Sequence, residues 1–305
     1  MFNLQQTLWR LQQKTEKAYY LAVLRVLVSV WFIKELLFRW PVFDFLYDNQ
    51  SSLKINPSQT LAAVGLDVFF LRDHYMLVVG TCLLLLVLNI FGIGRNIVSL
   101  LLYLSMTVLY HLNPKFANSG DEMSMLLLLY LSFANTFSHL VLFRRKPFSP
   151  GKEKVYNLLS NLATCSIIAN LCLSYFVAGA SKISQSYWQD GTAIYYFIND
   201  DRYSLFAAGG KHVAMPMSLS FIIGYGTVIL ELLFPFLVFY KRTRPIVLGL
   251  CLLMHIGIYS FLMVYGMTII FVMQYGLFYS NEEVVTTAEK IKAYLKKLFR
   301  FAPKQ

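Results

Sequence analysis

Charged residues are scarce in this chain of 305 residues: they make up 14% of it, whereas hydrophobic residues make up 57%. A soluble globular domain carries about 25% charged residues, so the composition excludes that class. Cysteine is also rare, and all four cysteines lie inside apolar runs, with no CxxC spacing and no histidine partner. This pattern is typical of small buried hydrophobic residues and argues against a disulfide framework or a zinc site. The four are Cys82, Cys165, Cys172 and Cys251.

The motifs of several enzyme classes are missing as well. The chain has no Gly-rich phosphate loop, no serine nucleophile elbow and no histidine cluster at metal-ligand spacing. These absences argue against nucleotide binding, serine hydrolysis and metal catalysis, and we predict no metal site. No internal repeat is visible, and no two halves share broken helices at matching positions, which disfavours a transporter built from inverted repeats.

What the sequence does contain is a series of long apolar stretches. Crossing a bilayer as a helix takes roughly 17–25 predominantly apolar residues. Eight stretches approach or reach this length, and they predict an all-α, polytopic membrane bundle of about eight transmembrane helices. The stretches are 18–38, 75–91, 97–112, 122–142, 156–180, 217–240, 246–263 and 266–280.

The basic residues are distributed unevenly between the segments that connect these stretches. The formal net charge is +11, which would suit nucleic acid if the charge formed one patch. With a cytoplasmic N-terminus, however, 18 of the 27 Lys and Arg residues fall on the cytoplasmic side and seven fall outside. This asymmetry is the positive-inside signal. We therefore predict a bacterial inner-membrane protein with both termini in the cytoplasm, with membrane lipids and not nucleic acid as its partners.

Three regions follow from this topology. Residues 1–17 form an amphipathic N-terminal segment, 18–280 form the membrane domain, and 281–305 form a basic amphipathic tail. The tail is suited to lie on anionic head groups, although an ordinary solvated end helix explains it too. The membrane domain includes two long outer loops, 39–74 and 181–215.

Two ionisable residues are predicted at mid-membrane depth. Glu231 lies twelve residues before Thr243, the centre of a short basic connection, and His255 lies twelve residues after it. In an antiparallel hairpin this places both at one depth, where a carboxylate facing the imidazole can fix its tautomer or share its proton. Pro235 frees the carbonyl of Glu231, four residues back. A packing clamp without chemistry is the alternative.

Other charged residues near the membrane have simpler alternatives. Arg25 lies deep in the first stretch and requires an acceptor, which we expect to be a carboxylate from another helix in a structural ion pair. Asp121 and Glu122 follow Asn118 at the outer mouth of the fourth stretch. Acidic residues in the first turn of a capped helix explain them, and a role facing an outer pocket is the alternative.

The outer end of the fifth stretch is the most distinctive segment of the chain. It contains Gly179 among other small residues, then Lys182, and leads into Trp188 and Gly191. Small residues let another backbone or a flat ligand approach closely, and a partly desolvated lysine can serve as a base or nucleophile. Trp188 suits the membrane interface. A lysine that only reaches up to the aqueous interface is the alternative for Lys182.

These residues resemble a known superfamily. The outer end of the fifth stretch resembles the signature of vitamin K-dependent γ-carboxylase, and so does the block that runs from Glu231 to His255. Bacterial relatives share this unit as the horizontally transferred transmembrane (HTTM) domain. The segments 191–197 and 255–258 are most similar to the sporulation-delaying protein B type. The residues that carry the first resemblance are Ala178, Gly179, Lys182, Ile183, Trp188 and Gly191.

The resemblance implies roles for individual residues. The position of Lys182 corresponds to a lysine proposed to deprotonate vitamin K hydroquinone, so a quinone is the implied cofactor. Glu231 and His255 are implied as polar support in the same helix bundle. The sporulation-delaying protein B type implies a small partner subunit and a secreted antimicrobial peptide toxin as substrate.

Three functional hypotheses remain open on the sequence alone. The chain matures or modifies a secreted peptide at the outer face of the membrane, with Lys182 as a base or with the protein only holding the peptide for a protease. Alternatively, it is a quinone-dependent carboxylase-like enzyme. Third, it is a non-enzymatic lipid- or peptide-binding or immunity component.

Overall fold

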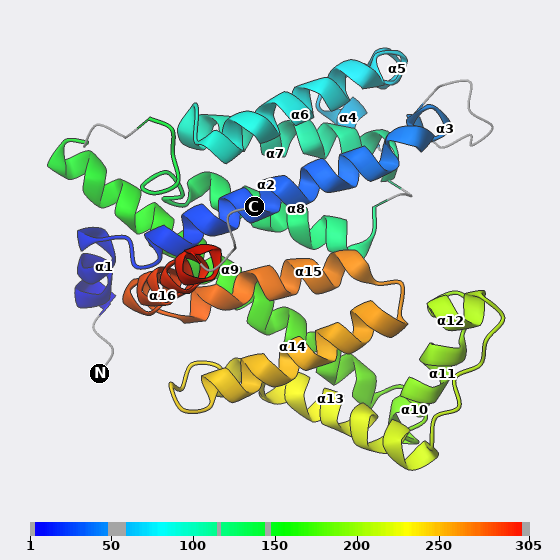
Figure 1. Cartoon of the computed structure of the whole chain (residues 1–305). Helices are drawn as coiled ribbons and strands as arrows, with labels where there is room; N and C mark the ends of the chain where they lie inside the picture. Colours follow the sequence, from blue (N-terminus) through cyan, green and yellow to red (C-terminus); the bar gives the residue numbers. More distant parts are fainter. Residues whose placement is uncertain (1–3, 48–58, 115–116, 144–147, 301–305) are drawn as a thin grey trace. The chain divides into compact units, whose positions relative to one another are not determined.

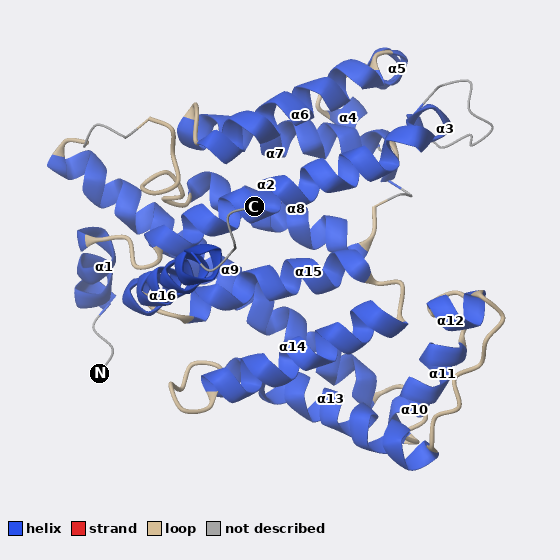
Figure 2. Ribbon diagram, viewed as in Figure 1, coloured by secondary structure: helices blue, strands red, loops and turns tan. Residues whose placement is uncertain are grey.

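The protein is built from helices. The computed structural model describes residues 4–47, 59–114, 117–143 and 148–300, and these residues contain no β-strand (Figures 1 and 2). One isolated bridge pairs Ser204 with Leu262. The predicted all-α class is confirmed for the described part of the chain.

A helix lies on each of the eight predicted stretches. Three of them, α9, α13 and α14, are long and apolar enough to cross a membrane by length and composition, and two apolar helices are shorter, at Tyr75–Phe91 and Tyr265–Phe278. The chain is therefore a helical membrane protein, and the number of eight crossings stays a prediction. The eight helices are α2 (Ala18–Arg39), α6 (Tyr75–Phe91), α7 (Arg95–Leu112), α8 (Ser119–Phe133), α9 (Pro150–Ile183), α13 (Met217–Leu237), α14 (Arg244–Phe261) and α15 (Tyr265–Gln274) with η3 (Tyr275–Phe278).

The fourth stretch is shorter than predicted. We expected a helix over 122–142, whereas α8 ends at Phe133. Asn96 donates hydrogen bonds to the carbonyls of Ser132 (2.9 Å) and Ala134 (3.0 Å), so a side chain satisfies the last carbonyls of the helix. The backbone N–H of Asn135 donates to the hydroxyl of Ser160 at 2.8 Å. Hydrogen bonds from side chains to the backbone compete with the backbone hydrogen bonds of a helix, so the helix ends here. The apolar run in the sequence gave no indication of these side-chain bonds.

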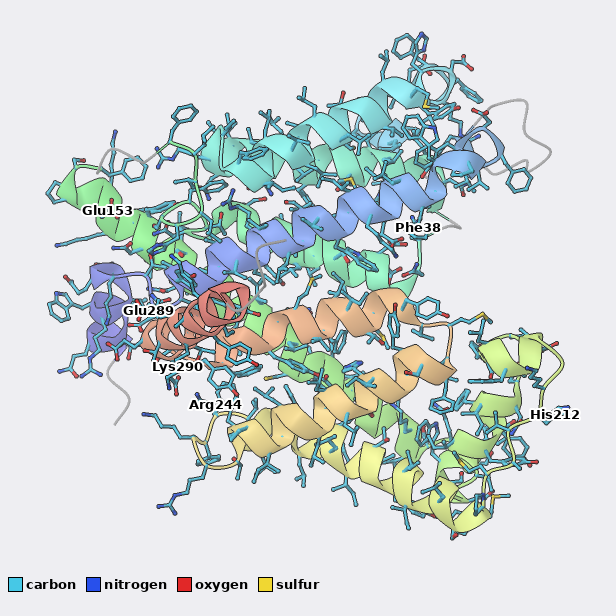
Figure 3. All side chains as sticks on the ribbon, in the orientation of Figure 1. Phe38, Glu153, His212, Arg244, Glu289 and Lys290 are labelled. Atoms are coloured by element: carbon cyan, nitrogen blue, oxygen red, sulfur yellow. The ribbon has the colours of Figure 1, made fainter. Side chains whose placement is uncertain are left out.

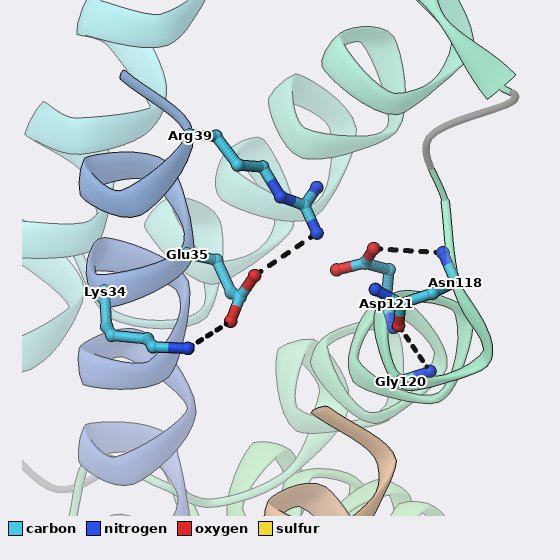
Figure 4. A network of polar contacts seen from close by, with 6 residues as sticks. All are labelled: Lys34, Glu35, Arg39, Asn118, Gly120 and Asp121. Atoms are coloured by element: carbon cyan, nitrogen blue, oxygen red, sulfur yellow. Dashed lines mark hydrogen bonds and ion pairs between the residues drawn. The ribbon is translucent and has the colours of Figure 1, made fainter. Parts of the chain in front are cut away.

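The chain divides into two compact units, of which the first comprises 1–117, 124–165 and 279–305. Within it, α2 packs against α6 and α16, and α6 packs against α7. Near the end of α2, Glu35 accepts hydrogen bonds from Lys34 at 2.8 Å and from Arg39 at 3.2 Å (Figure 4). The remaining helices of this unit are α1 (Leu4–Gln13), η1 (Trp40–Val42), α3 (Phe43–Tyr47), α4 (Gln59–Ala63), α5 (Val68–Asp73) and α16 (Asn281–Arg300).

Both predicted end segments are helical where the structure describes them, as α1 and α16. Two asparagines one turn apart on α9 bind the C-terminal end of α1. Asn157 donates to the carbonyls of Gln12 and Gln13 at 3.2 and 3.3 Å. Asn161 donates to those of Leu11 and Lys14, both at 2.8 Å. These bonds satisfy carbonyls at the end of α1, while binding of these helices to head groups stays a prediction.

The second unit comprises 118–123 and 166–278. In it α13 and α14 form a hairpin, and α14 also packs against α15 (Figure 1). The predicted outer loop 181–215 folds into three short helices, of which α11 packs against α13. In the same loop Arg202 donates to Asp200 at 2.6 and 3.0 Å and lowers the pKa of that carboxyl to about 2. The short helices are α10 (Ser186–Gln189), α11 (Ala193–Asn199) and α12 (Leu205–Ala208).

Large apolar side chains cover the outward surfaces of the helices. Leu253 on α14 is 65% exposed, and Phe38 at the end of α2 is 75% exposed (Figure 3). In water such surfaces would form extended hydrophobic patches that soluble monomers avoid. In a bilayer they face hydrocarbon, which agrees with the apolar composition of these helices.

Candidate functional site

The candidate site begins with one face of α9. Tyr175, Gly179 and Lys182 are spaced four and three residues apart, so they lie on the same side of the helix. Gly179 is buried, and a Cβ added to it would lie 3.0 Å from the Leu232 side chain and 3.1 Å from Cβ of Glu231. Glycine therefore lets α13 approach α9 closely.

Lys182 and Glu231 form an ion pair across this close contact. The Lys182 ammonium donates to both carboxylate oxygens of Glu231, at 2.9 and 2.7 Å, and also to the carbonyl of Ala178 at 3.4 Å. The side chains are 18% and 8% exposed, respectively. The three donors of the ammonium thus have three acceptors. The lysine also lies in the last turn of a helix, where the helix dipole favours a cation.

Trp188 covers the ion pair from the loop that follows α9. The Lys182 ammonium lies 5.2 Å from the centre of the indole ring, within the range of a cation–π contact, and Trp188 itself is buried. The structure therefore brings together Lys182, Glu231 and Trp188, three candidate site residues that the sequence located in separate segments. Their roles in catalysis or binding stay predictions.

Gly191 fixes the turn that carries Trp188. Its φ of +69° lies in the left-handed region, and a Cβ there would collide with the ring of Phe221. Ser220, buried near the start of α13, donates its hydroxyl to the Gly191 carbonyl at 2.8 Å. The turn is thereby held against α13, and glycine meets both the backbone and the steric requirement.

The predicted pairing of Glu231 with His255 is wrong. His255 is buried, and its Nε2 lies 2.8 Å from the hydroxyl of Tyr175, which in turn lies 2.5 Å from the hydroxyl of Tyr275. Nδ1 of His255 has no hydrogen-bond partner among the described residues. Equal depth in a hairpin does not determine direction: both side chains point to the same face of α9, the glutamate to Lys182 and the histidine to Tyr175.

Tyr175 and Tyr275 are polar residues of this region to which the sequence assigned no role. A weak signal was present for Tyr175, which lies seven residues before Lys182 and so shares its helix face. Tyr275 gave no such signal, because one tyrosine near the end of an apolar stretch is ordinary at a membrane interface.

Asp121 and Glu122 lie at the start of α8, in the same unit. The side chain of Asn118 accepts hydrogen bonds from the backbone N–H groups of Gly120 (2.8 Å) and Asp121 (3.0 Å). The Asp121 carboxylate accepts from the backbone N–H of Asn118 at 3.1 Å (Figure 4). This reciprocal arrangement is a capping box. Asp121 is buried and Glu122 is exposed, so the helix-capping interpretation accounts for this position, and a pocket role stays a prediction.

Arg25 belongs to the first unit, and no carboxylate among the described residues pairs with it. Its guanidinium donates to the backbone carbonyls of Asn89 and, at 2.5 Å, Leu140, and it lies 4.7 Å from the ring centre of Phe137. Asn89 lies in the last turn of α6, where carbonyls lack helical partners and the dipole favours a cation. Arg25 therefore caps a helix end and does not form the expected ion pair.

No group of three or more His, Cys, Asp or Glu residues in the described ranges is arranged to hold a metal ion. What the fold and the site define is a helical membrane protein with an enclosed lysine–glutamate pair at the end of a long apolar helix. The profile of the HTTM domain matches residues 20–275, and the chain belongs to this family. No curated protein and no solved structure gives a match.

Proposed function

We propose that this HTTM-domain protein matures or modifies a secreted peptide at the outer face of the bacterial inner membrane, in the manner of the sporulation-delaying protein B type. Lys182 acts as the base. The single observation that supports the proposal is the ion pair of Lys182 and Glu231, partly buried beside Trp188 at the end of a membrane-length helix. Lys182 and Glu231 are also among the residues in which the chain resembles the γ-carboxylase superfamily.

The chemistry of the pair follows from its charges. As a closed ion pair, the lysine is a cation and cannot accept a proton. When the proton passes from the ammonium to the Glu231 carboxylate, the pair becomes a neutral amine and a neutral acid. The amine can then take a proton from a substrate X–H group, which leaves the substrate as an anion beside the newly formed ammonium.

A quinone-dependent carboxylase-like reaction is the second candidate, and it rests on the family resemblance. The closed ion pair has no free N–H group to donate to a quinone oxygen, because Glu231 and Ala178 already accept hydrogen bonds from all three donors of the Lys182 ammonium. We therefore assign no step to a quinone. Mass spectrometry of lipids and quinones that copurify with the protein separates the two candidates: a bound naphthoquinone favours the second.

The test compares secreted peptides from cells that produce the wild-type protein or the Lys182→Ala variant. We expect at least one secreted peptide to be processed or mass-shifted only with the wild type. The matched control is Lys211→Ala, which removes an exposed lysine from the same outer loop and should leave the peptide pattern unchanged. Identical patterns for wild type and Lys182→Ala, with both proteins inserted in the membrane, would favour a non-enzymatic binding or immunity role.

A further inference from the structure

A groove runs along the outward side of the α13–α14 hairpin. It has a volume of about 260 Å³ and extends on α13 from Gly226 through Leu233 to Leu237, and on α14 from Thr243 to Leu250. Of the residues that line it, only Thr243 carries a polar side chain. The eleven helical steps from Gly226 to Leu237 give a length of ~16 Å at ~1.5 Å per residue. The groove is thus long, narrow and apolar.

One end of the groove meets a cluster of positive charge. Lys241, Arg242 and Arg244 lie in the connection between the two helices, on either side of Thr243 (Arg244 is labelled in Figure 3). Lys241 and Arg242 are exposed and form no ion pair with a described residue. The Thr243 hydroxyl donates to the carbonyl of Leu237 at 2.5 Å and so holds the connection against the end of α13. Lys241 and Arg242 therefore lie within two residues of Thr243, the polar residue that lines this end of the groove.

We propose that this groove binds one phospholipid with an anionic head group. One acyl chain lies between α13 and α14, and the phosphate lies at Lys241 and Arg242. The groove length of ~16 Å equals about half of the ~30 Å hydrocarbon thickness, which is the depth of one leaflet. Basic residues beside a membrane helix attract anionic lipids, and the head group supplies the charge that the connection lacks.

The groove is lined by apolar side chains of both helices along its length, with Thr243 as its one polar lining residue. This lining suits an acyl chain whose head group lies at the Thr243 end. Neither Lys182 nor Glu231 lines the groove. The lipid proposal can therefore be tested independently of the proposed catalytic function.

The experiment measures phospholipid binding to the purified full chain by native mass spectrometry in detergent. The probes are phosphatidylglycerol, which is anionic, and phosphatidylcholine of the same acyl chains. The groove variant is Leu250→Trp, which fills the groove from α14. Its matched control is Leu252→Trp, an exposed leucine two residues on, at 41% against 48% for Leu250, which does not line the groove. We expect Leu250→Trp to weaken binding of both lipids at least tenfold and Leu252→Trp to leave it unchanged.

A second variant tests the head group. Replacing both cations, Lys241→Gln with Arg242→Gln, should remove the preference for phosphatidylglycerol, which we expect to be of order tenfold in the wild type from about 1 kcal/mol per basic residue. Lys211→Gln is the control that removes an exposed lysine elsewhere in the same unit. Equal binding of both lipids to the wild type would overturn the proposal. So would unchanged binding in Leu250→Trp, or a wild-type protein that retains a second copy or another protein instead of lipid.

Discussion

Two buried polar side chains of the second unit, those of His255 and Tyr275, each have the hydroxyl of Tyr175 as a hydrogen-bond partner. This hydroxyl contacts Nε2 of His255 at 2.8 Å and the hydroxyl of Tyr275 at 2.5 Å. A hydroxyl has one proton to donate, so the direction of both bonds follows from the histidine tautomer. If Tyr175 donates to His255, Tyr275 donates to Tyr175; with the other tautomer both bonds reverse. The three side chains thus form a short chain with two proton arrangements, next to the ion pair on the same helix face.

The ion pair allows structural and chemical roles to be separated at the residue scale. Glu231→Leu leaves the Lys182 ammonium partly buried without its carboxylate. We expect it to lower the free energy of unfolding by about 3 kcal/mol, the lower end of the range for breaking a buried pair, because the lysine side chain is 18% exposed. The measurement is thermal or denaturant unfolding of the purified protein in detergent.

The double variant Lys182→Met with Glu231→Leu provides the control. Apolar side chains of similar volume replace both charges, so stability should return to within about 1 kcal/mol of the wild type. Peptide processing should nevertheless stay absent, because no base remains. A stable double variant that still processes the peptide would show that the pair is only a packing clamp.

At the scale of the helices, the contact between α9 and α13 depends on Gly179. A Cβ at this position would lie 3.0 to 3.1 Å from Leu232 and Glu231. In most helix interiors, replacing glycine by alanine raises the free energy of unfolding by about 0.5–1 kcal/mol. Here, however, the added methyl group would separate the helices that carry the ion pair. We therefore expect Gly179→Ala to lower the melting temperature and to weaken Lys182-dependent peptide processing.

Gly249 on α14 is the matched control for this prediction, since a Cβ there meets no atom within 4 Å. Gly249→Ala should be neutral or slightly stabilising on helix propensity alone. If both alanine variants have the same melting temperature and the same processing activity, then close approach at Gly179 is not needed for the site.

The positions of the helices could be predicted from the sequence more completely than their orientations. Apolar length located a helix on every predicted stretch, and small residues before Lys182 correctly indicated a close approach. Equal depth of Glu231 and His255 said nothing about the direction of either side chain, because successive helical residues rotate by about 100°. The partner of Glu231 is Lys182 on α9, which is distant in sequence, and no local sequence pattern indicated that the two residues meet.

The same physical reason explains the misassigned partner of Arg25. A buried cation needs acceptors, and the sequence offers only side chains as visible candidates. Backbone carbonyls were the actual acceptors, two of them at the end of α6 and one at Leu140, and those on α6 depend on where that helix ends. Gly92, in the left-handed region at φ +71°, terminates it, so the acceptor could be inferred only with the helix boundary known.

At the scale of the whole molecule, the unequal distribution of basic residues predicts which loops lie on which side of the membrane, and this prediction can be tested. The predicted eight crossings place both termini on one side of the membrane, and the distribution of basic residues predicts that this side is the cytoplasm, with Lys241 inside and Lys211 outside. Both lysines are exposed, so cysteine at either position should react with a thiol reagent that can reach it. In intact cells a membrane-impermeant reagent should label Lys211→Cys and leave Lys241→Cys unlabelled until the membrane is permeabilised.

The native cysteines provide the background for this measurement. Cys82, Cys172 and Cys251 are buried, and Cys165 lies within the apolar helix α9, so the wild type should show little labelling in intact cells. The result bears directly on the proposed function, because Lys182 and Lys211 belong to one predicted outer loop region. If Lys241→Cys is labelled first, the loop that carries Trp188 faces the cytoplasm. The ion pair would then be out of reach of a secreted peptide, and a cytoplasmic substrate would have to replace it.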